Sequence, residues 1–390
     1  MLGSLPLLFT VFEPSGDVLA ARLIEEVRRR QPQRKVVAFG GPAMEAAGAE
    51  LIESTTGHAK MGLGAVTEAR ELLRRRGVLS KWLKENDLAA HVPTDSPAAN
   101  WSLCAAVRKH RPGAKVVHLV GPQMWAWAPW RVRKLRRLTD RVLCLLPFEP
   151  EWFGSRGVPA TFVGHPLFDE ATLVATSSEV VDTDGQPLRG GGVKLALLPG
   201  SRPKEVAANW PTMLKVYDQL RHRVEGLSVA VAGADAARVR QVRSLCPGGR
   251  PPRGMQVTVG MAGPTLDWAD AALVVSGTAT LQAASRRTPA VAMYNADMRL
   301  WRLVGRHLIR TRTFALPNVI AESVGAERVM AELIPHDGAP EPVAAALRPL
   351  LTDPSERRAR EAGFGVIAEA FAGRGFRREA ADGLLAEIDG

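Results

Sequence analysis

Short apolar runs alternate with longer amphipathic segments along almost the whole chain, and this alternation constrains the fold more than any other feature. Apolar runs bounded by turn residues predict buried strands, whereas apolar residues spaced three and four apart predict helices. Strands that alternate with helices form parallel sheets with right-handed crossovers. The sequence therefore predicts an α/β protein.

The expected strands lie at 5–12, 35–39, 88–92, 115–120, 141–145, 195–198, 227–231, 271–275 and 290–293. The expected helices lie at 18–30, 67–85, 100–109, 131–138, 203–223, 278–286 and 299–309, with two more near 356–372 and 377–388.

A polar, Gly-rich stretch at 176–192 (TSSEVVDTDGQPLRGGG) divides this pattern and is interpreted as a linker or a mobile surface loop. A length of 390 residues allows two domains of ordinary size. We expect an N-terminal Rossmann-like domain at 1–175, a C-terminal Rossmann-like domain at 193–353 and a helical tail at 354–390. Packing of the tail helices against the first domain is compatible with this arrangement.

The net charge of +11 favours phosphate-bearing ligands, nucleic acid or an anionic membrane surface, although solubility alone would also explain arginines spread over surface helices. The three cysteines lack the CxxC spacing of zinc sites and are odd in number, so we expect no disulfide framework, no zinc site and a reducing cytosol. No run approaches 18 apolar residues, so no transmembrane helix is expected. The N-terminus resembles a first strand rather than a signal peptide.

The stretch FEPSGD, at 12–17, leads from the first apolar run directly into a helical segment. A strand–turn–helix with Ser15 or Asp17 as the N-cap would explain this composition. The same geometry creates a ligand site at the carboxyl end of a strand in open α/β sheets. A capped loop and a site are both compatible with the stretch.

Two strand–turn–helix stretches in the second half are candidate phosphate sites. In LALLPGSRPKEV (195–206), backbone N–H groups at the turn would point at an anion and Arg202 would close on it, although such turns are common. In VVSGTATLQAA (274–284), Gly277 allows close backbone approach. Ser276, Thr278 and Thr280 offer hydroxyls either to a phosphate or to the helix as caps.

Asp95 is the candidate general base. It lies in TDSPAAN, at the expected end of the strand 88–92, where a carboxylate is able to take a proton from an attacking hydroxyl. An Asx-turn ahead of Pro97 is the alternative interpretation.

The stretch GPQMWAWAPWRVRKLRRLTDR, at 121–141, combines three tryptophans with a basic helix. It suits docking on anionic lipid or a phosphate, and no nucleic-acid-binding motif accompanies it. Core tryptophans and solvated arginines are the alternative. His165, in FVGHPLFD, is either structural or catalytic.

Taken in order, these stretches resemble the lipid-A-disaccharide synthases, a family of inverting glycosyltransferases. The resemblance implies two Rossmann-like domains that face each other across a cleft, the GT-B arrangement. The matching runs are EPSGD, FGGPAMEAAG, MG at 61–62, DSP with Asn100, WAW, LPFE, VGHPL, LLPGSRPKEV, SGTATL and LPN.

The resemblance implies that UDP-2,3-diacylglucosamine reacts with 2,3-diacylglucosamine 1-phosphate to give a β-1',6-linked disaccharide and UDP. No metal or other cofactor is implied, and the reaction would occur at the cytoplasmic face of the inner membrane. The partners would be the UDP-sugar donor, the acylated acceptor and an anionic membrane, without nucleic acid; a homodimer is compatible with the two tail helices.

The resemblance also implies roles for individual residues. Asp95 would be the catalytic base. The acceptor side would hold Glu13, Ser15, Asp17, Asn100, Trp125, Trp127 and His165. UDP would be held by Gly200, Ser201, Arg202, Glu205, Ser276, Gly277, Thr278, Ala279, Thr280, Gln282 and Asn318.

Several positions depart from the family pattern. Gln282 stands where a glutamate is usual, which replaces a charge-assisted hydrogen bond with a neutral one. The other departures are Phe12, Ala65, Ala98, Ala99, Ala128 and Pro335. Three alternatives therefore stay open: a relative with another glycolipid acceptor, another two-domain UDP-sugar enzyme such as an epimerase or a peptidoglycan glycosyltransferase, and a non-catalytic UDP-sugar or glycolipid-binding protein.

Overall fold

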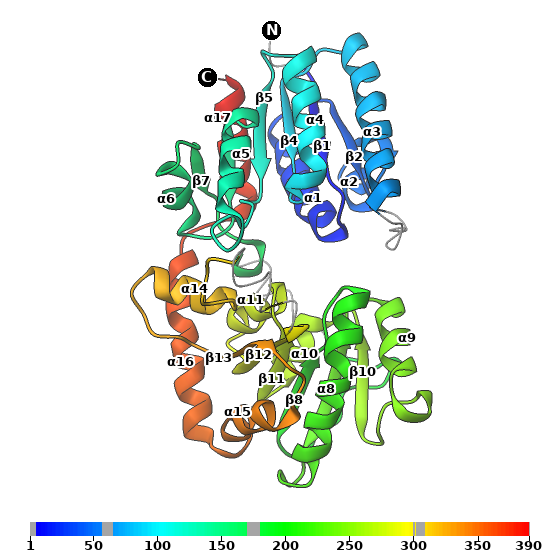
Figure 1. Cartoon of the computed structure of the whole chain (residues 1–390), viewed down its shortest axis with the longest axis vertical. Coiled ribbons are helices and arrows are strands. Elements are labelled where there is room, and N and C mark those ends of the chain that lie inside the picture. Colours follow the sequence, from blue (N-terminus) through cyan, green and yellow to red (C-terminus); the bar gives the residue numbers. More distant parts are fainter. Residues whose placement is uncertain (1–4, 57–64, 170–179, 299–300, 302–308, 390) are drawn as a thin grey trace. The chain divides into compact units, whose positions relative to one another are not determined.

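The computed structural model describes residues 5–56, 65–169, 180–298, 301 and 309–389. The chain forms two compact units, one of residues 1–169 with 373–390 and the other of residues 170–372 (Figure 1). The second unit is thus inserted between the body of the first unit and its last helix.

The first unit contains a seven-stranded sheet in the order β3-β2-β1-β4-β5-β6-β7, with every pairing parallel. Its strands are β1 (Leu7–Thr10), β2 (Val36–Gly40), β3 (Glu50–Ser54), β4 (Ala90–Pro93), β5 (Lys115–Leu119), β6 (Arg141–Cys144) and β7 (Ala160–Phe162). Its helices are α1 (Pro14–Arg30), α2 (Pro42–Ala46), α3 (Ala65–Glu85), α4 (Pro97–His110), α5 (Val132–Leu138), α6 (Glu149–Gly154) and α17 (Phe376–Asp389), with short 3-10 turns η2 (Pro129–Arg131) and η3 (Pro166–Phe168).

Both faces of this sheet are buried, because successive residues of a strand point to opposite faces. Leu7 and Phe9 pack in one cluster with residues of α1 and α17, whereas Leu8 packs in another with residues of α3 and α4. The continuous apolar run of β1 is therefore what a central parallel strand requires. Phe376 of α17 is fully buried in the first of these clusters.

The second unit contains a six-stranded sheet in the order β10-β9-β8-β11-β12-β13, again with every pairing parallel. Its strands are β8 (Lys194–Leu198), β9 (Ser228–Gly233), β10 (Met255–Val259), β11 (Ala271–Val275), β12 (Ala290–Asn295) and β13 (Ala331–His336). Its helices are α8 (Pro203–Arg221), α9 (Ala236–Ser244), α10 (Ala262–Trp268), α11 (Thr278–Ser285), α14 (Leu316–Ser323), α15 (Pro340–Thr352) and α16 (Pro354–Phe371), with a 3-10 turn η4 (Pro247–Gly249).

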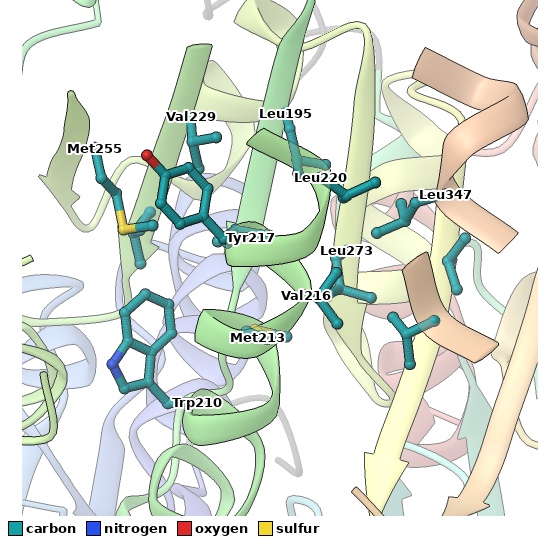
Figure 2. Close-up of a cluster of buried hydrophobic side chains, with 14 of the residues drawn as sticks. Leu195, Trp210, Met213, Val216, Tyr217, Leu220, Val229, Met255, Leu273 and Leu347 are labelled. Atoms are coloured by element: carbon teal, nitrogen blue, oxygen red, sulfur yellow. The ribbon is translucent and has the colours of Figure 1, made fainter. Parts of the chain in front are cut away.

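Helix α8 covers one face of this sheet. Figure 2 shows the fully buried Trp210 and Met213 of α8, with Tyr217, against Val229 and Met255 of the strands. The core of the second unit is therefore built on this helix.

The α/β class and the two parallel sheets are confirmed. The tail expected after Pro354 forms two helices as predicted, of which α16 belongs to the second unit and α17 to the first. Residues 180–192 of the expected loop are attached to the second unit, since the amide of Thr183 donates to the carbonyl oxygen of Val257 at 2.8 Å. Most of the helix expected at 299–309 lies outside the described residues.

Candidate functional site

Each sheet has one point where the strand order reverses, and ligands of open α/β sheets bind at the carboxyl ends of the strands there. In the first unit this point lies between β1 and β4, and in the second unit between β8 and β11. The sequence stretches EPSGD and TDSP follow β1 and β4, and the stretches PGSR and SGTAT follow β8 and β11. Each pair of predicted turns therefore meets at the switch point of its own unit.

In the first unit the two turns are in contact. A Cβ atom on Gly16 would lie 2.9 Å from Cγ1 of Val11 and 4.0 Å from Cβ of Asp95, so only glycine lets α1 start this close to the Asp95 turn. The hydroxyl of Ser96 donates to Oε1 of Glu13 at 3.0 Å. Glu13 and Asp95 are half-buried and Ser15 is exposed.

The N-cap of α1 is Glu13, so the prediction that Ser15 or Asp17 caps this helix is wrong. Pro14 begins the helix one turn earlier than expected because its fixed φ suits a first helical position. Asp17 is 3% exposed and instead serves α2: its carboxylate accepts hydrogen bonds from the amides of Gly41 (3.0 Å), Ala43 (3.0 Å) and Met44 (3.2 Å). A carboxylate at the start of a helix is favoured by the helix dipole.

The Asp95 turn has an unusual backbone. Asp95 has φ of 50° and Ser96 has φ of 33°, both in the left-handed region that non-glycine residues seldom adopt. The amide of Asp95 donates to the carbonyl oxygen of Leu119 on β5 at 3.1 Å, and Asn100 is fully buried behind the turn.

Trp125 and Trp127 have different environments. Nε1 of Trp125 donates to Oε1 of Glu149 at 3.1 Å. Trp127 is 46% exposed, and the guanidinium of Arg131 lies 3.9 Å from the centre of its ring. Desolvation raises the pKa of the fully buried Glu149 to about 8, although hydrogen bonds from Trp125 and the backbone oppose the shift.

Helix α5 presents a basic surface, defined here as Arg133, Lys134, Arg136 and Arg137, all of which are exposed. None of the four forms an ion pair with any residue of the described ranges. Trp130, 54% exposed, lies in the preceding turn η2, so aromatic and basic side chains adjoin here.

His165 stabilises its own loop. Its Nδ1 accepts a hydrogen bond from the amide of Leu167 at 3.1 Å. Desolvation, followed by the charge of Arg22, lowers the pKa of His165 to about 3, so the ring is neutral near pH 7. A neutral capping imidazole fits the structural interpretation of this histidine.

In the second unit, the turn after β8 is already filled by a carboxylate of the chain. Oε2 of Glu205 accepts hydrogen bonds from the amides of Ser201 (3.2 Å) and Arg202 (3.1 Å), and Oε1 lies 3.4 Å from Nη1 of Arg202. Gly200 has φ of 110°, and a Cβ there would lie 2.8 Å from Cβ of Glu205. Glu205 therefore satisfies the amides that were expected to meet an anion.

The turn after β11 is more open. Gly277 has φ of 141°, a Cβ atom there would have open space around it, and no side chain of the described residues caps α11. Thr278 is exposed, and Ala279 is half-buried. Thr280 is buried and donates its hydroxyl to the carbonyl oxygen of Gly277 at 2.7 Å, and Ser276 donates to that of Phe314 at 3.4 Å.

Asn318 is fully buried and uses its whole carboxamide within the unit. Its Oδ1 accepts from the amides of Val329 (2.9 Å) and Met330 (3.0 Å), and its Nδ2 donates to Glu332 (2.6 Å). Asn318 therefore joins the start of α14 to β13. Gln282 is half-buried, and its side chain has no hydrogen bond with the described residues.

The other departures lie in different settings. Ala98 is exposed and Ala99 half-buried in the first turn of α4, Ala128 is buried with φ of 50°, and Pro335 lies on β13. The guanidinium of Arg75 lies 5.3 Å from the ring centre of Phe12. Residues 61–62 lie outside the described ranges, and Ala65 is the first residue of α3.

Two buried polar residues near the Asp95 turn were missed from the sequence, Thr10 on β1 and His91 on β4. Their signal is a polar side chain within an apolar strand, in LLFT and AHVP.

Within the described ranges, no cluster of three or more His, Cys, Asp or Glu side chains is arranged to hold a metal ion. In the same ranges, no helix combines the length and the apolar character needed to cross a bilayer.

Solved structures share this fold. Staphylococcus aureus MnaA in complex with UDP has a TM-score of 0.63 and 12% identity, covering 99% of this chain and 96% of that one. The glycotransferase of kitacinnamycin has a TM-score of 0.59 and 16% identity, covering 98% and 99% of the two chains.

Sequence comparisons give the family. A lipid-A-disaccharide synthase of Pseudomonas putida is 34% identical over 350 residues, covering 89% of this chain and 90% of that protein. One of Azotobacter vinelandii is 34% identical over 357 residues, covering 90% of each. Residues 7–378 match the sequence model of the lipid-A-disaccharide synthetase family. The chain belongs to the lipid-A-disaccharide synthetase family.

Proposed function

We propose that this protein is a glycosyltransferase of lipid A biosynthesis. It joins UDP-2,3-diacylglucosamine to 2,3-diacylglucosamine 1-phosphate and forms the β-1',6-linked disaccharide and UDP. The observation that carries the proposal is the match to the family over residues 7–378, within which a carboxylate turn and an open helix N-terminus occupy the switch points of the two sheets.

Asp95 acts as the general base in this proposal. The 6-hydroxyl of the acceptor transfers its proton to the Asp95 carboxylate while its oxygen forms a bond to C1 of the donor sugar. The bond between C1 and the diphosphate oxygen breaks at the same time, and UDP leaves with the electron pair. The position of Asp95 at the end of β4, half-buried beside the Glu13 turn, supports this role.

The diphosphate of UDP binds first at the turn Ser276–Gly277–Thr278. Free amides at a helix N-terminus and the helix dipole stabilise negative charge, and Gly277 leaves room for close approach. At the other turn, Glu205 competes for the amides of Ser201 and Arg202. Glu205 also pairs with the guanidinium of Arg202. Arg202 therefore contacts the diphosphate only if Glu205 shares or releases this guanidinium.

The basic surface of α5 binds anionic lipid head groups at the cytoplasmic face of the inner membrane. Four exposed cations beside the exposed Trp127 and Trp130 support this proposal, because cations attract anionic lipids and tryptophan favours the membrane interface. A homodimer stays a prediction, which the mass of the purified protein in light scattering tests.

The proposed function is tested by incubating purified protein with both acylated sugars in mixed micelles and scoring UDP release together with the disaccharide. Both products in equal amounts support the proposal. UDP binding without turnover would instead indicate a binding protein or a different acceptor. Absence of both UDP binding and turnover would overturn the proposal.

A further inference from the structure

The backbone of the Asp95 turn is held in an unfavourable conformation. Asp95 and Ser96 have φ of 50° and 33° in succession, and left-handed non-glycine residues each cost about 1 kcal/mol or more. Such conformations persist only when surrounding contacts determine them. The contacts that hold this turn therefore determine the position of the Asp95 carboxylate.

Asn100 supplies most of these contacts. Its Nδ2 lies 3.2, 3.0 and 3.4 Å from the carbonyl oxygens of Thr94, Asp95 and Ser96. Carbonyl oxygens only accept hydrogen bonds, so the nitrogen of the carboxamide faces the turn and its oxygen faces away. That oxygen lies 2.5 Å from the hydroxyl of Thr10.

The direction of the remaining hydrogen bonds follows. The one hydroxyl proton of Thr10 goes to Oδ1 of Asn100, so this hydroxyl accepts from Nε2–H of His91, which lies 2.8 Å away. Burial lowers the pKa of His91 to about 3, so the ring is neutral and carries its proton on Nε2. Nδ1 of His91 has no partner among the described residues, as this tautomer allows.

All three side chains are fully buried. Buried polar side chains are costly unless their hydrogen bonds are made, and a satisfied network favours one arrangement of the groups that it joins. Here the network leads from β4 through β1 to the three carbonyls of the turn.

We propose that His91, Thr10 and Asn100 form a positioning chain that fixes the direction of the Asp95 carboxylate. The proposal rests on the proposed function, in which Asp95 is the base. It makes Asn100 a positioning residue rather than the acceptor contact that the family resemblance implies.

Thr10→Val tests the chain because it replaces the hydroxyl by a methyl group of similar shape, and Thr10→Ser restores the hydroxyl. We expect Thr10→Val to lower kcat about 10- to 100-fold with the donor KM within about twofold of wild type, since small misplacements of a catalytic group cost rate rather than binding. Thr10→Ser should return kcat to within about threefold. If Thr10→Val does not fold, His91→Phe removes the first donor and should lower kcat in the same way.

Thr258→Val is the matched control, because Thr258 is a fully buried strand threonine in the second unit whose hydroxyl lies 3.0 Å from that of Thr265. Equal kcat values for Thr10→Val and Thr258→Val, or no rescue by Thr10→Ser, would overturn the proposal.

Amide hydrogen exchange of the full chain gives a second measurement that needs no activity. Thr10→Val should speed exchange of the Asp95 and Asn100 amides about tenfold relative to Thr258→Val, since the Asp95 amide is bonded to Leu119 of β5 and the Asn100 amide to Ser96 of the turn. Unchanged exchange would overturn the chain. Faster exchange in a protein that turns over neither sugar would keep the chain and reject the proposed function.

Discussion

Nε1 of Trp125 donates a hydrogen bond to Oε1 of Glu149 at 3.1 Å, and the carboxyl group of Glu149 is fully buried in the first unit. The amide of Leu146 donates to the other oxygen at 3.2 Å. A Cβ on Gly121 would lie 2.8 Å from the same oxygen, so the chain packs closely around this acid. Glu149 thereby anchors the WAW segment to α6.

Glu149 should make the stability of the first unit fall as pH rises. Its pKa is raised from 4.5 to about 8, so between these values the folded chain holds a proton that the unfolded chain has released. The free energy of unfolding then decreases with pH, by at most about 1.4 kcal/mol per unit from this group. Urea unfolding at several pH values should show a smaller decrease for Glu149→Gln. Glu151→Gln, exposed on the same helix, should keep the wild-type dependence, and equal dependence in all three proteins would refute the assignment.

Asp95→Asn should abolish most turnover and preserve UDP binding. The amide keeps the shape of the side chain but does not accept the proton of the acceptor hydroxyl, so kcat should fall about 100- to 10,000-fold. Calorimetry with UDP should give an unchanged Kd. Asp87→Asn, an exposed aspartate of the first unit, is the control and should keep wild-type kcat. Wild-type rates for Asp95→Asn would remove Asp95 as the base.

Gly277→Ala should weaken UDP binding. A φ of 141° is available to glycine alone, so an alanine would rotate the amides of the proposed diphosphate site. We expect Kd to rise at least about tenfold in calorimetry, the effect of losing one hydrogen bond to a charged group. Gly254→Ala is matched to it, since Gly254 also has positive φ and open space around a Cβ position. Similar Kd values for the two variants would exclude this turn as the diphosphate site.

Removing two charges from α5 should release the protein from anionic membranes. Arg133→Gln with Arg137→Gln should lower the partition coefficient on vesicles containing phosphatidylglycerol about 30-fold, at about 1 kcal/mol for each cation. Arg250→Gln with Arg253→Gln removes two exposed charges from the second unit as a control. An equal loss of binding in both pairs would show that net charge, rather than the α5 surface, attracts the vesicles.

Phe376→Ala should destabilise the first unit strongly. Phe376 is the first residue of α17 and is fully buried among residues of α1 and β1, so its removal leaves a cavity that costs about 3–5 kcal/mol. Urea unfolding measures this loss. Arg378→Ala, 65% exposed on the same helix, should stay within about 0.5 kcal/mol of wild type. A small effect of Phe376→Ala would mean that α17 contributes little to this core.

The central strands could be predicted from sequence because they are buried on both faces and therefore mainly apolar, as in β1, or apolar throughout, as in β11. The strands β3 (ELIES) and β13 (AELIPH) were missed, because each lies at a sheet edge and carries charged or proline residues. Strand β10 (MQVTV) was missed as well, because it also lies at a sheet edge and its polar residues alternate with apolar ones. The helix α14 was missed since it begins with Leu-Pro-Asn, a turn-like sequence.

The turns of the site could be predicted because their composition is itself the signal: small, polar and Gly residues directly after an apolar run. The partners of their side chains could not. Asp17 binds amides more than twenty positions away on α2, and Thr10 meets His91 only because β1 and β4 are neighbours in the sheet. Which hydrogen bond a carboxylate or hydroxyl makes depends on tertiary neighbours that one sequence does not display.

The return of α17 to the first unit affects how the protein is made. Translation delivers Phe376, Leu384 and Ile388 after the whole second unit has emerged from the ribosome. Until then, one face of the N-terminal sheet is covered by α1 but lacks the side chains of α17, whereas the inserted unit already has its own strands and helices. The nascent N-terminal half therefore keeps part of this apolar face exposed until α17 has been made.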